Sequence, residues 1–160
     1  MHVPFCKSIC SFCNYERLRP SSPAVLRAWL DQLQATLATL APAVRHLTFH
    51  TLYFGGGTPS VLTAAMLREA VDAVHGALRF HRLAHRTFEL DPAVMNREKL
   101  DALVARGFRH FSFGVQTLDA SVNADHNRGA QGRALVGRRF EEFAGAGLGR
   151  VSCDFLLGMA

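Results

Sequence analysis

The sequence predicts an α/β fold in which parallel strands alternate with helices and curl into part of a (βα) barrel. Segments that are apolar throughout, as in strands buried within a parallel sheet, alternate along the chain with segments of helical periodicity. Cysteines, glycines and isolated polar residues follow the strand segments, at the ends where such folds carry their chemistry. About five βα units fit into the 160 residues, which we interpret as one domain.

The first half of the chain predicts two strands and two helices. Residues 1–5 are apolar and end at a cysteine-rich loop, as the last part of a strand would. A helix is predicted over residues 23–40, because Ser22 is placed to cap it and leucines recur at helical spacing. Residues 46–54 are rich in β-branched and aromatic residues and predict a buried strand. Residues 63–78 have the apolar spacing of a second amphipathic helix.

The second half repeats this alternation. Residues 87–90 predict a short strand, which an Asp-Pro pair ends. Residues 96–106 predict a third helix, capped by its first residue, an asparagine, and stopped by a glycine. A strand over residues 108–115 leads into a polar stretch. A fourth helix and a last strand are predicted over residues 133–146 and 151–157.

The composition favours a cytoplasmic protein with neither a nucleic-acid partner nor a membrane span. The formal net charge is +5, but the arginines are scattered and form no basic stripe interleaved with aromatic residues. No apolar run approaches the roughly 20 residues that a membrane span needs. The positive charge could still help hold anionic ligands by long-range attraction.

Cys6, Cys10 and Cys13 form the most informative pattern, C-x3-C-x2-C, within one short loop. Three thiols at this spacing can turn toward one compact object. The candidates are an iron–sulfur cluster, a zinc ion that also binds His2, and a chance grouping. A disulfide framework is disfavoured, because four cysteines are sparse for 160 residues. The fourth, Cys153, lies in the last predicted strand and is expected to be a structural thiol.

Other candidate site residues stand at the carboxyl ends of the remaining strands. Glycines at 55–57 allow backbone to approach a ligand closely, although a tight turn would also explain them. Glu89 ends an apolar strand and needs a polar or cationic partner, either an arginine or a ligand. Gln116 and Arg128 follow the fourth strand, and Arg128 can grip a carboxylate with two hydrogen bonds. Asp154 lies in the fifth strand, so we expect one shared active site.

Five runs of sequence resemble one family in their residues, order and intervals. They are His2–Cys6, Tyr53–Ser60, Glu89–Pro92, Phe111–Gln116 and Asp154–Gly158. Together they span nearly the whole chain and resemble the oxygen-independent coproporphyrinogen III oxidase branch of the radical S-adenosylmethionine (SAM) enzymes. The resemblance implies that a [4Fe–4S] cluster is held by Cys6, Cys10 and Cys13. It also implies SAM contacts from Gly56, Gly57, Thr58, Glu89, Gln116, Arg128 and Asp154.

The resemblance further implies a partial (βα) barrel of the radical SAM type. In this family an electron from the reduced cluster cleaves SAM to a 5′-deoxyadenosyl radical, which abstracts hydrogen from a substrate. We therefore expect a small-molecule substrate, such as a porphyrinogen or haem, and an electron donor such as flavodoxin or ferredoxin. The alternative is a haem-binding chaperone of the same branch without oxidase activity.

The chain departs from the family pattern in its loop and in its length. The oxidase loop continues Gly-Cys-Asn after the third cysteine, whereas this chain reads Asn14-Tyr15-Glu16, which argues against a standard oxidase. The family continues into a sixth βα unit and a C-terminal domain that covers the substrate. We therefore expect residues 1–160 to be a radical SAM core domain that is incomplete at both ends.

Overall fold

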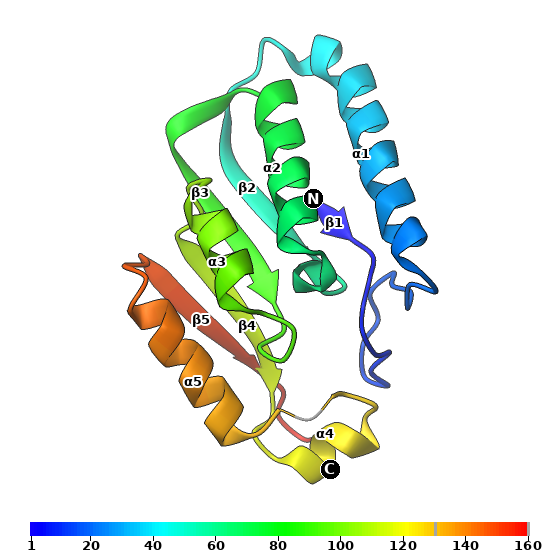
Figure 1. The fold of residues 1–160 in the computed structure, drawn as a ribbon, viewed down its shortest axis with the longest axis vertical. Helices are drawn as coiled ribbons and strands as arrows, with labels where there is room; N and C mark the ends of the chain where they lie inside the picture. The colour runs from blue at the N-terminus through cyan, green and yellow to red at the C-terminus, as the bar shows by residue number, and fades with distance from the viewer. Residues whose placement is uncertain (130, 160) are drawn as a thin grey trace.

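The computed structural model describes residues 1–129 and 131–159 and contains one sheet of five strands (Figure 1). The strands lie side by side in sequence order and are β1 (His2–Val3), β2 (Phe49–Gly56), β3 (Phe80–Leu90), β4 (His110–Gln116) and β5 (Arg150–Phe155). Every neighbouring pair is parallel, which confirms the predicted α/β architecture. The carboxyl ends of the strands therefore meet at one edge of the sheet.

The longer helices cover one face of the sheet (Figure 1). The helical segments are α1 (Pro23–Val44), the 3-10 turn η1 (Pro59–Val61), α2 (Ala64–Ala77), α3 (Arg97–Val104), α4 (Ala120–Asp125) and α5 (Arg133–Ala144). Helix α1 continues past its expected end and includes Pro42. Helix α4 lies in the polar stretch for which no element was predicted; its cap is Asp119, whose carboxylate accepts from Ser121 N at 2.8 Å. No helix in the described ranges is long and apolar enough to cross a membrane.

Strand β3 is much longer than the strand predicted over residues 87–90. It begins at Phe80, which pairs with Phe49; the next pair is Thr51 with His85, so the extra residues of this irregularity lie in β3. The first part of β3 carries Arg82 and His85, both exposed, so its sequence lacks the apolar run of a buried strand. His85 lies in continuous register with Thr87, two residues further along the strand, so both are on the face of the sheet that no helix covers, where polar side chains are tolerated.

The core lies between the sheet and the helical layer. Phe54, Phe88 and Phe111, on three neighbouring strands, are fully buried. The ring of Phe108 packs edge-on against Phe54 and Phe88 at centroid distances of 5.8 and 5.9 Å, and Phe143 of α5 packs against Phe111 at 5.1 Å. Burial of each such side chain contributes about 1.5–3 kcal/mol, so this cluster holds the central strands and α5 together.

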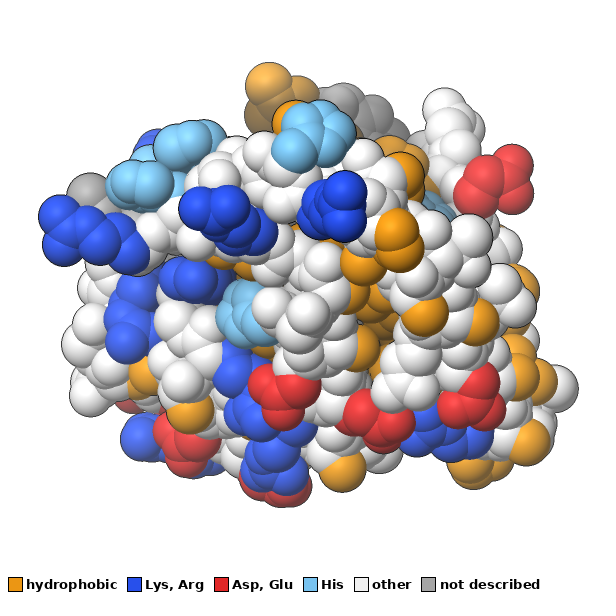
Figure 2. All heavy atoms as spheres, turned by 90° about the horizontal axis from the view of Figure 1, so that it is seen from above, with side chains coloured by type: hydrophobic (Ala, Val, Ile, Leu, Met, Phe, Trp, Pro, Cys, Tyr) orange, Lys and Arg blue, Asp and Glu red, His pale blue; other side chains and the backbone are white. Residues whose placement is uncertain are grey.

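Basic residues gather where strands β2 to β5 begin, at the amino ends (Figure 2). The segments 45–50, 79–86, 109–110 and 149–150 contain no Asp or Glu, and their arginines are Arg45, Arg79, Arg82, Arg86, Arg109 and Arg150. The other twelve of the 18 basic residues are outnumbered by 13 acidic ones, so the net charge of +5 arises at this end. Helix C-termini, which carry partial negative charge, also lie here; Arg109 donates to Val104 O of α3 at 2.7 Å.

Two helices begin at residues that were predicted to cap them, but the two side chains behave differently. Asn96 accepts a hydrogen bond from Lys99 N at 3.0 Å, whereas Ser22 forms no side-chain capping bond. We therefore predict that Asn96→Ala lowers the free energy of unfolding by about 1 kcal/mol and that Ser22→Ala changes it by only a few tenths. Urea denaturation followed by circular dichroism measures both. Equal losses in the two variants would contradict this account of the caps.

Candidate functional site

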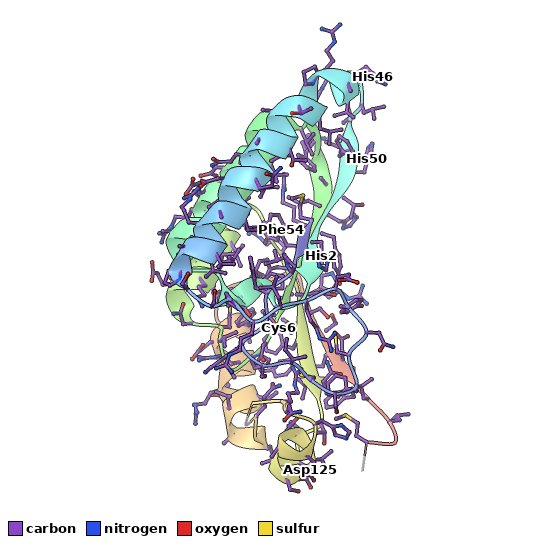
Figure 3. The ribbon with its side chains drawn as sticks, turned by 90° about the vertical axis from the view of Figure 1, so that its right-hand side faces the viewer. His2, Cys6, His46, His50, Phe54 and Asp125 are labelled. Atoms are coloured by element: carbon purple, nitrogen blue, oxygen red, sulfur yellow. The ribbon has the colours of Figure 1, made fainter. Side chains whose placement is uncertain are left out.

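The cysteine loop connects β1 to α1 and is fastened to the glycine turn after β2. Cys6 N donates to Leu18 O at 3.0 Å, which closes the loop on itself. Thr58 N donates to Phe5 O at 2.7 Å and joins the loop to the turn. Figure 3 shows Cys6 near the carboxyl ends of the strands, with His2 on one side and Asp125 on the other. The loop therefore lies at the edge of the sheet where the remaining candidate residues stand.

The thiols of Cys6, Cys10 and Cys13 line one cavity of about 540 Å³. Cys6 is buried, and the other two are partly exposed. Burial raises the pKa of the Cys6 thiol. Thr58 Oγ1 donates a hydrogen bond to Cys6 Sγ at 3.4 Å, and this bond lowers the pKa and partly offsets the effect of burial. Cys153 packs against the hydrophobic core instead, and burial also raises its pKa.

Glycine is required on the wall of this cavity for two separate reasons. A Cβ atom on Gly57 would lie 2.7 Å from Phe5 O and 3.0 Å from Cys6 Sγ, closer than side-chain carbons come to such atoms. Gly56 has φ +110°, a conformation that other residues rarely adopt. The turn therefore brings backbone directly against the cysteine loop and leaves backbone atoms facing the cavity.

Glu89, at the end of β3, is held by the glycine turn and by a phenol. Gly56 N donates to Glu89 Oε2 at 3.0 Å, and Tyr53 OH donates to Glu89 Oε1. Burial, followed by the bond to Glu89, raises the pKa of the Tyr53 phenol. Neither of these two contacts comes from an arginine, which was one of the partners expected for Glu89. Glu89 also lines a second cavity of about 360 Å³ beside β1, so its carboxylate forms part of the wall of both.

Arg128 reaches the cavity from the loop after α4 and is 11% exposed. Its guanidinium donates to Gly114 O, lies 3.9 Å from Asp91 Oδ2, and approaches Cys10 Sγ at 3.9 Å. With its amide oxygen turned toward the guanidinium, the buried Gln131 accepts from Arg128 Nη2 at 2.8 Å. Arg128 is thus held in place by Gly114 O and Gln131, while its guanidinium also approaches the cysteine loop at Cys10.

The fourth and fifth strands complete the cavity. Gln116, at the end of β4, has φ +67° and lines the cavity. Ser112 Oγ donates to Asp154 Oδ2 at 3.0 Å, so the Asp154 carboxylate is oriented from the neighbouring strand. The structure therefore brings all ten candidate residues named from the sequence to one cavity: Cys6, Cys10, Cys13, Gly56, Gly57, Thr58, Glu89, Gln116, Arg128 and Asp154.

Several residues of the cavity wall were not predicted. Lys7, Arg17, Asp91 and Ser112 also line it. Arg17 Nη2 donates to Cys10 O at 3.0 Å, which fixes the middle of the cysteine loop. In sequence, Arg17 cannot be distinguished from a surface arginine. In β4, Ser112 lies between two buried phenylalanines, so its side chain is on the opposite, open face of the sheet. A polar residue at such an alternating position is a sequence signal by which Ser112 could have been found.

The same loop is held from α4, by a contact that no sequence pattern indicated. Ser11 Oγ lies 2.7 Å from His126 Nδ1, and Ser11 N donates to His126 O at 3.1 Å. The ring of His126 also packs edge-on against Phe12 at a centroid distance of 5.8 Å. The two residues between Cys10 and Cys13 are therefore anchored to the segment that carries Arg128.

The donor set fits an iron–sulfur cluster in its chemistry. Three thiols face one space, and the Gly57 position is free of any Cβ atom beside Cys6. In the described part of the chain, no three His, Cys, Asp or Glu side chains, these thiols included, are close enough together to hold a single metal ion, whereas a [4Fe–4S] cluster is larger and is bound by sulfurs further apart. Cationic and anionic side chains are balanced around the cavity, with Lys7, Arg17 and Arg128 against Glu89, Asp91 and Asp154.

Comparisons with known proteins agree with this geometry. The family model for the radical SAM superfamily matches residues 1–160. The oxygen-independent coproporphyrinogen III oxidase of Cereibacter sphaeroides is 33% identical over 99% of this chain, and the heme chaperone HemW of Bacillus subtilis is 27% identical over 99%. The solved structure of coproporphyrinogen III oxidase (HemN) from Escherichia coli, a radical SAM enzyme, superposes with a TM-score of 0.92 at 26% identity over 99% of the chain.

The chain corresponds to only part of each of these relatives. It spans 35% of the Cereibacter oxidase, 42% of the Bacillus chaperone and 36% of the Escherichia oxidase chain. Within this chain, the matched residues include the parallel sheet, the cysteine loop and the cavity described above. Because the family model matches along the whole chain, this protein belongs to the radical SAM superfamily.

Proposed function

We propose that this chain holds a [4Fe–4S] cluster through Cys6, Cys10 and Cys13 and binds SAM in the adjoining cavity. Both cofactors are those that membership of the family implies. The observation that supports the proposal most strongly is that three thiols and seven predicted SAM contacts, from all five strands and their loops, line a single cavity. Chance would not be expected to bring residues so far apart in sequence to one place.

The contacts suggest how each wall of the cavity would hold SAM. The glycine turn exposes backbone groups beside the cysteine loop, and Glu89 offers carboxylate oxygens to an ammonium group. Arg128, held by Gly114 O, presents a guanidinium to a carboxylate. Asp154 accepts from Ser112 through one oxygen, which leaves the other available to a hydroxyl. These positions suit a ligand that carries both charges and hydroxyl groups.

When bound, the reduced cluster supplies the electron that cleaves SAM to a 5′-deoxyadenosyl radical. The residues of this chain would orient SAM and limit the access of water to it. We propose chemistry on a porphyrin-like or other organic substrate, in the cytoplasm, with an electron donor such as flavodoxin or ferredoxin. The similarity to coproporphyrinogen III oxidases supports this substrate class.

A haem-binding chaperone is the second candidate function. It is favoured by the similarity to HemW and by the loop after Cys13, where Asn14 and Tyr15 replace the oxidase pattern and line the cavity. The two functions differ in what the protein does with SAM. Two measurements separate them: an anaerobic SAM-cleavage assay, and a haem titration followed by absorption spectroscopy. A chaperone should bind haem, and it should not cleave SAM in proportion to the turnover of a substrate.

One prediction of the proposed function concerns the cluster. Anaerobic reconstitution of the chain should load about four irons per protein, as a [4Fe–4S] cluster requires. Cys6→Ala, Cys10→Ala and Cys13→Ala should each abolish iron binding, because each removes one of three thiolate ligands. Cys153→Ala is the control and should retain the iron, because Cys153 packs against the core. Iron content and visible absorption measure the result. An equal loss in the Cys153 variant, or exclusive zinc binding, would overturn the assignment.

Another prediction of the proposed function concerns SAM. Arg128→Ala should weaken SAM binding by about 1.5–3 kcal/mol, the effect of losing a hydrogen bond to a charged group. Arg138→Ala is the matched control, because that arginine is exposed on α5. Glu89→Gln keeps the shape of the side chain and should also weaken binding. Isothermal titration calorimetry on the reconstituted protein measures all three. Unchanged affinity in both Arg128→Ala and Glu89→Gln would exclude SAM from this cavity.

A further inference from the structure

A line of polar side chains crosses the open face of the sheet and ends at the candidate site. Thr87 Oγ1 of β3 lies 3.2 Å from His110 Nδ1 of β4, and His110 Nε2 lies 3.2 Å from Ser152 Oγ of β5. Ser152 Oγ donates to Ser112 Oγ at 3.2 Å, and Ser112 Oγ donates to Asp154 Oδ2 at 3.0 Å. Four successive hydrogen bonds therefore connect Thr87 to the cavity.

The carboxylate at the end of this line determines the direction of every bond in it. An ionised Asp154 can only accept, so Ser112 must donate its single hydroxyl proton to it. Ser112 then accepts from Ser152, whose only proton is also used. Ser152 must therefore accept from His110 Nε2–H, and the neutral ring accepts from Thr87 at Nδ1. The network assigns His110 the Nε2–H tautomer.

The surroundings of His110 keep its ring neutral, as this scheme requires. Burial lowers the pKa of His110, and the nearby side chains of Arg150 on β5 and His85 on β3 lower this pKa further. Thr87 and Ser112 are each 7% exposed. Buried hydroxyl groups almost always form hydrogen bonds, so these two side chains anchor the line within the sheet, while His110 and Ser152 are partly buried and Asp154 is exposed.

We propose that His110 is a positioning residue for Asp154 and acts through Ser152 and Ser112. The one-directional chain holds Asp154 Oδ2, which leaves Oδ1 facing the cavity as a fixed acceptor for a ligand hydroxyl. The effect on SAM affinity rests on the proposed function, since it requires SAM in this cavity. The tautomer of His110 and its dependence on Asp154 do not depend on any ligand.

The test therefore begins without SAM. Nuclear magnetic resonance of the ¹⁵N-labelled chain distinguishes protonated from unprotonated imidazole nitrogens, and the signals that vanish in His110→Gln identify His110 among the eight histidines. We expect Nε2 to be protonated and Nδ1 to be unprotonated at neutral pH. In Asp154→Ala the terminal acceptor is lost, and the ring should become a mixture of tautomers. An Nδ1–H ring in the unaltered chain, or no change in Asp154→Ala, overturns the proposal.

Two substitutions of His110 then test its role in the site. His110→Gln places an amide N–H near the position of Nε2 and should preserve SAM affinity within about twofold. His110→Asn reaches only the Thr87 side and should weaken SAM binding about tenfold, the effect of roughly one lost hydrogen bond. Equal affinities in the two folded variants would contradict the positioning role. If the unaltered chain binds no SAM, the proposed function fails, while the tautomer measurement still decides whether the chain of hydrogen bonds exists.

Discussion

The short parallel pairing of β1 with β2 is the contact on which the candidate site depends. His2 and Val3 pair with Gly55 and Gly56, so the cysteine loop leaves the sheet directly beside the glycine turn. The approach is close enough that a Cβ atom on Gly57 would lie 2.7 Å from Phe5 O. A two-residue strand has little stability by itself. Its position is secured by the hydrogen bonds from the turn to the loop and by the burial of Val3 and Phe5 in the core.

The fold could be predicted from sequence where residues face the core, and was missed where they do not. Strands β2, β4 and β5 are apolar runs on a sheet that helices cover, so their patterns are visible. The first part of β3 was missed because the exposed Arg82 and His85 interrupt its apolar pattern at the basic end. The candidate site could be predicted in outline, because parallel strands bring their carboxyl ends together. Tyr53 holds Glu89, and Gln131 holds Arg128. Both contacts depend on the orientation of side chains, which the spacing of residues in the sequence does not reveal.

Electrostatics differ between the two ends of the sheet. The excess of arginine that suggested long-range attraction of anionic ligands lies at the amino ends, away from the cavity. Around the cavity, three cations face three anions. The charged side chains there are fixed by individual short contacts within the protein, such as Arg128 with Gly114 O and Glu89 with Gly56 N. Such an arrangement would discriminate by the position of charge in a ligand and little by its total charge.

The separation of charge along the strands also gives the molecule a permanent electric dipole. Six arginines occupy the end where the strands begin, and no acidic residue stands among them in those segments. In the field of any anionic surface, such a body rotates until its positive end points toward that surface. The cysteine loop lies at the opposite end and would then be turned outward. An approach of this domain to an anionic surface would thus be oriented before contact, with the amino ends of the strands toward the surface and the cysteine loop away from it.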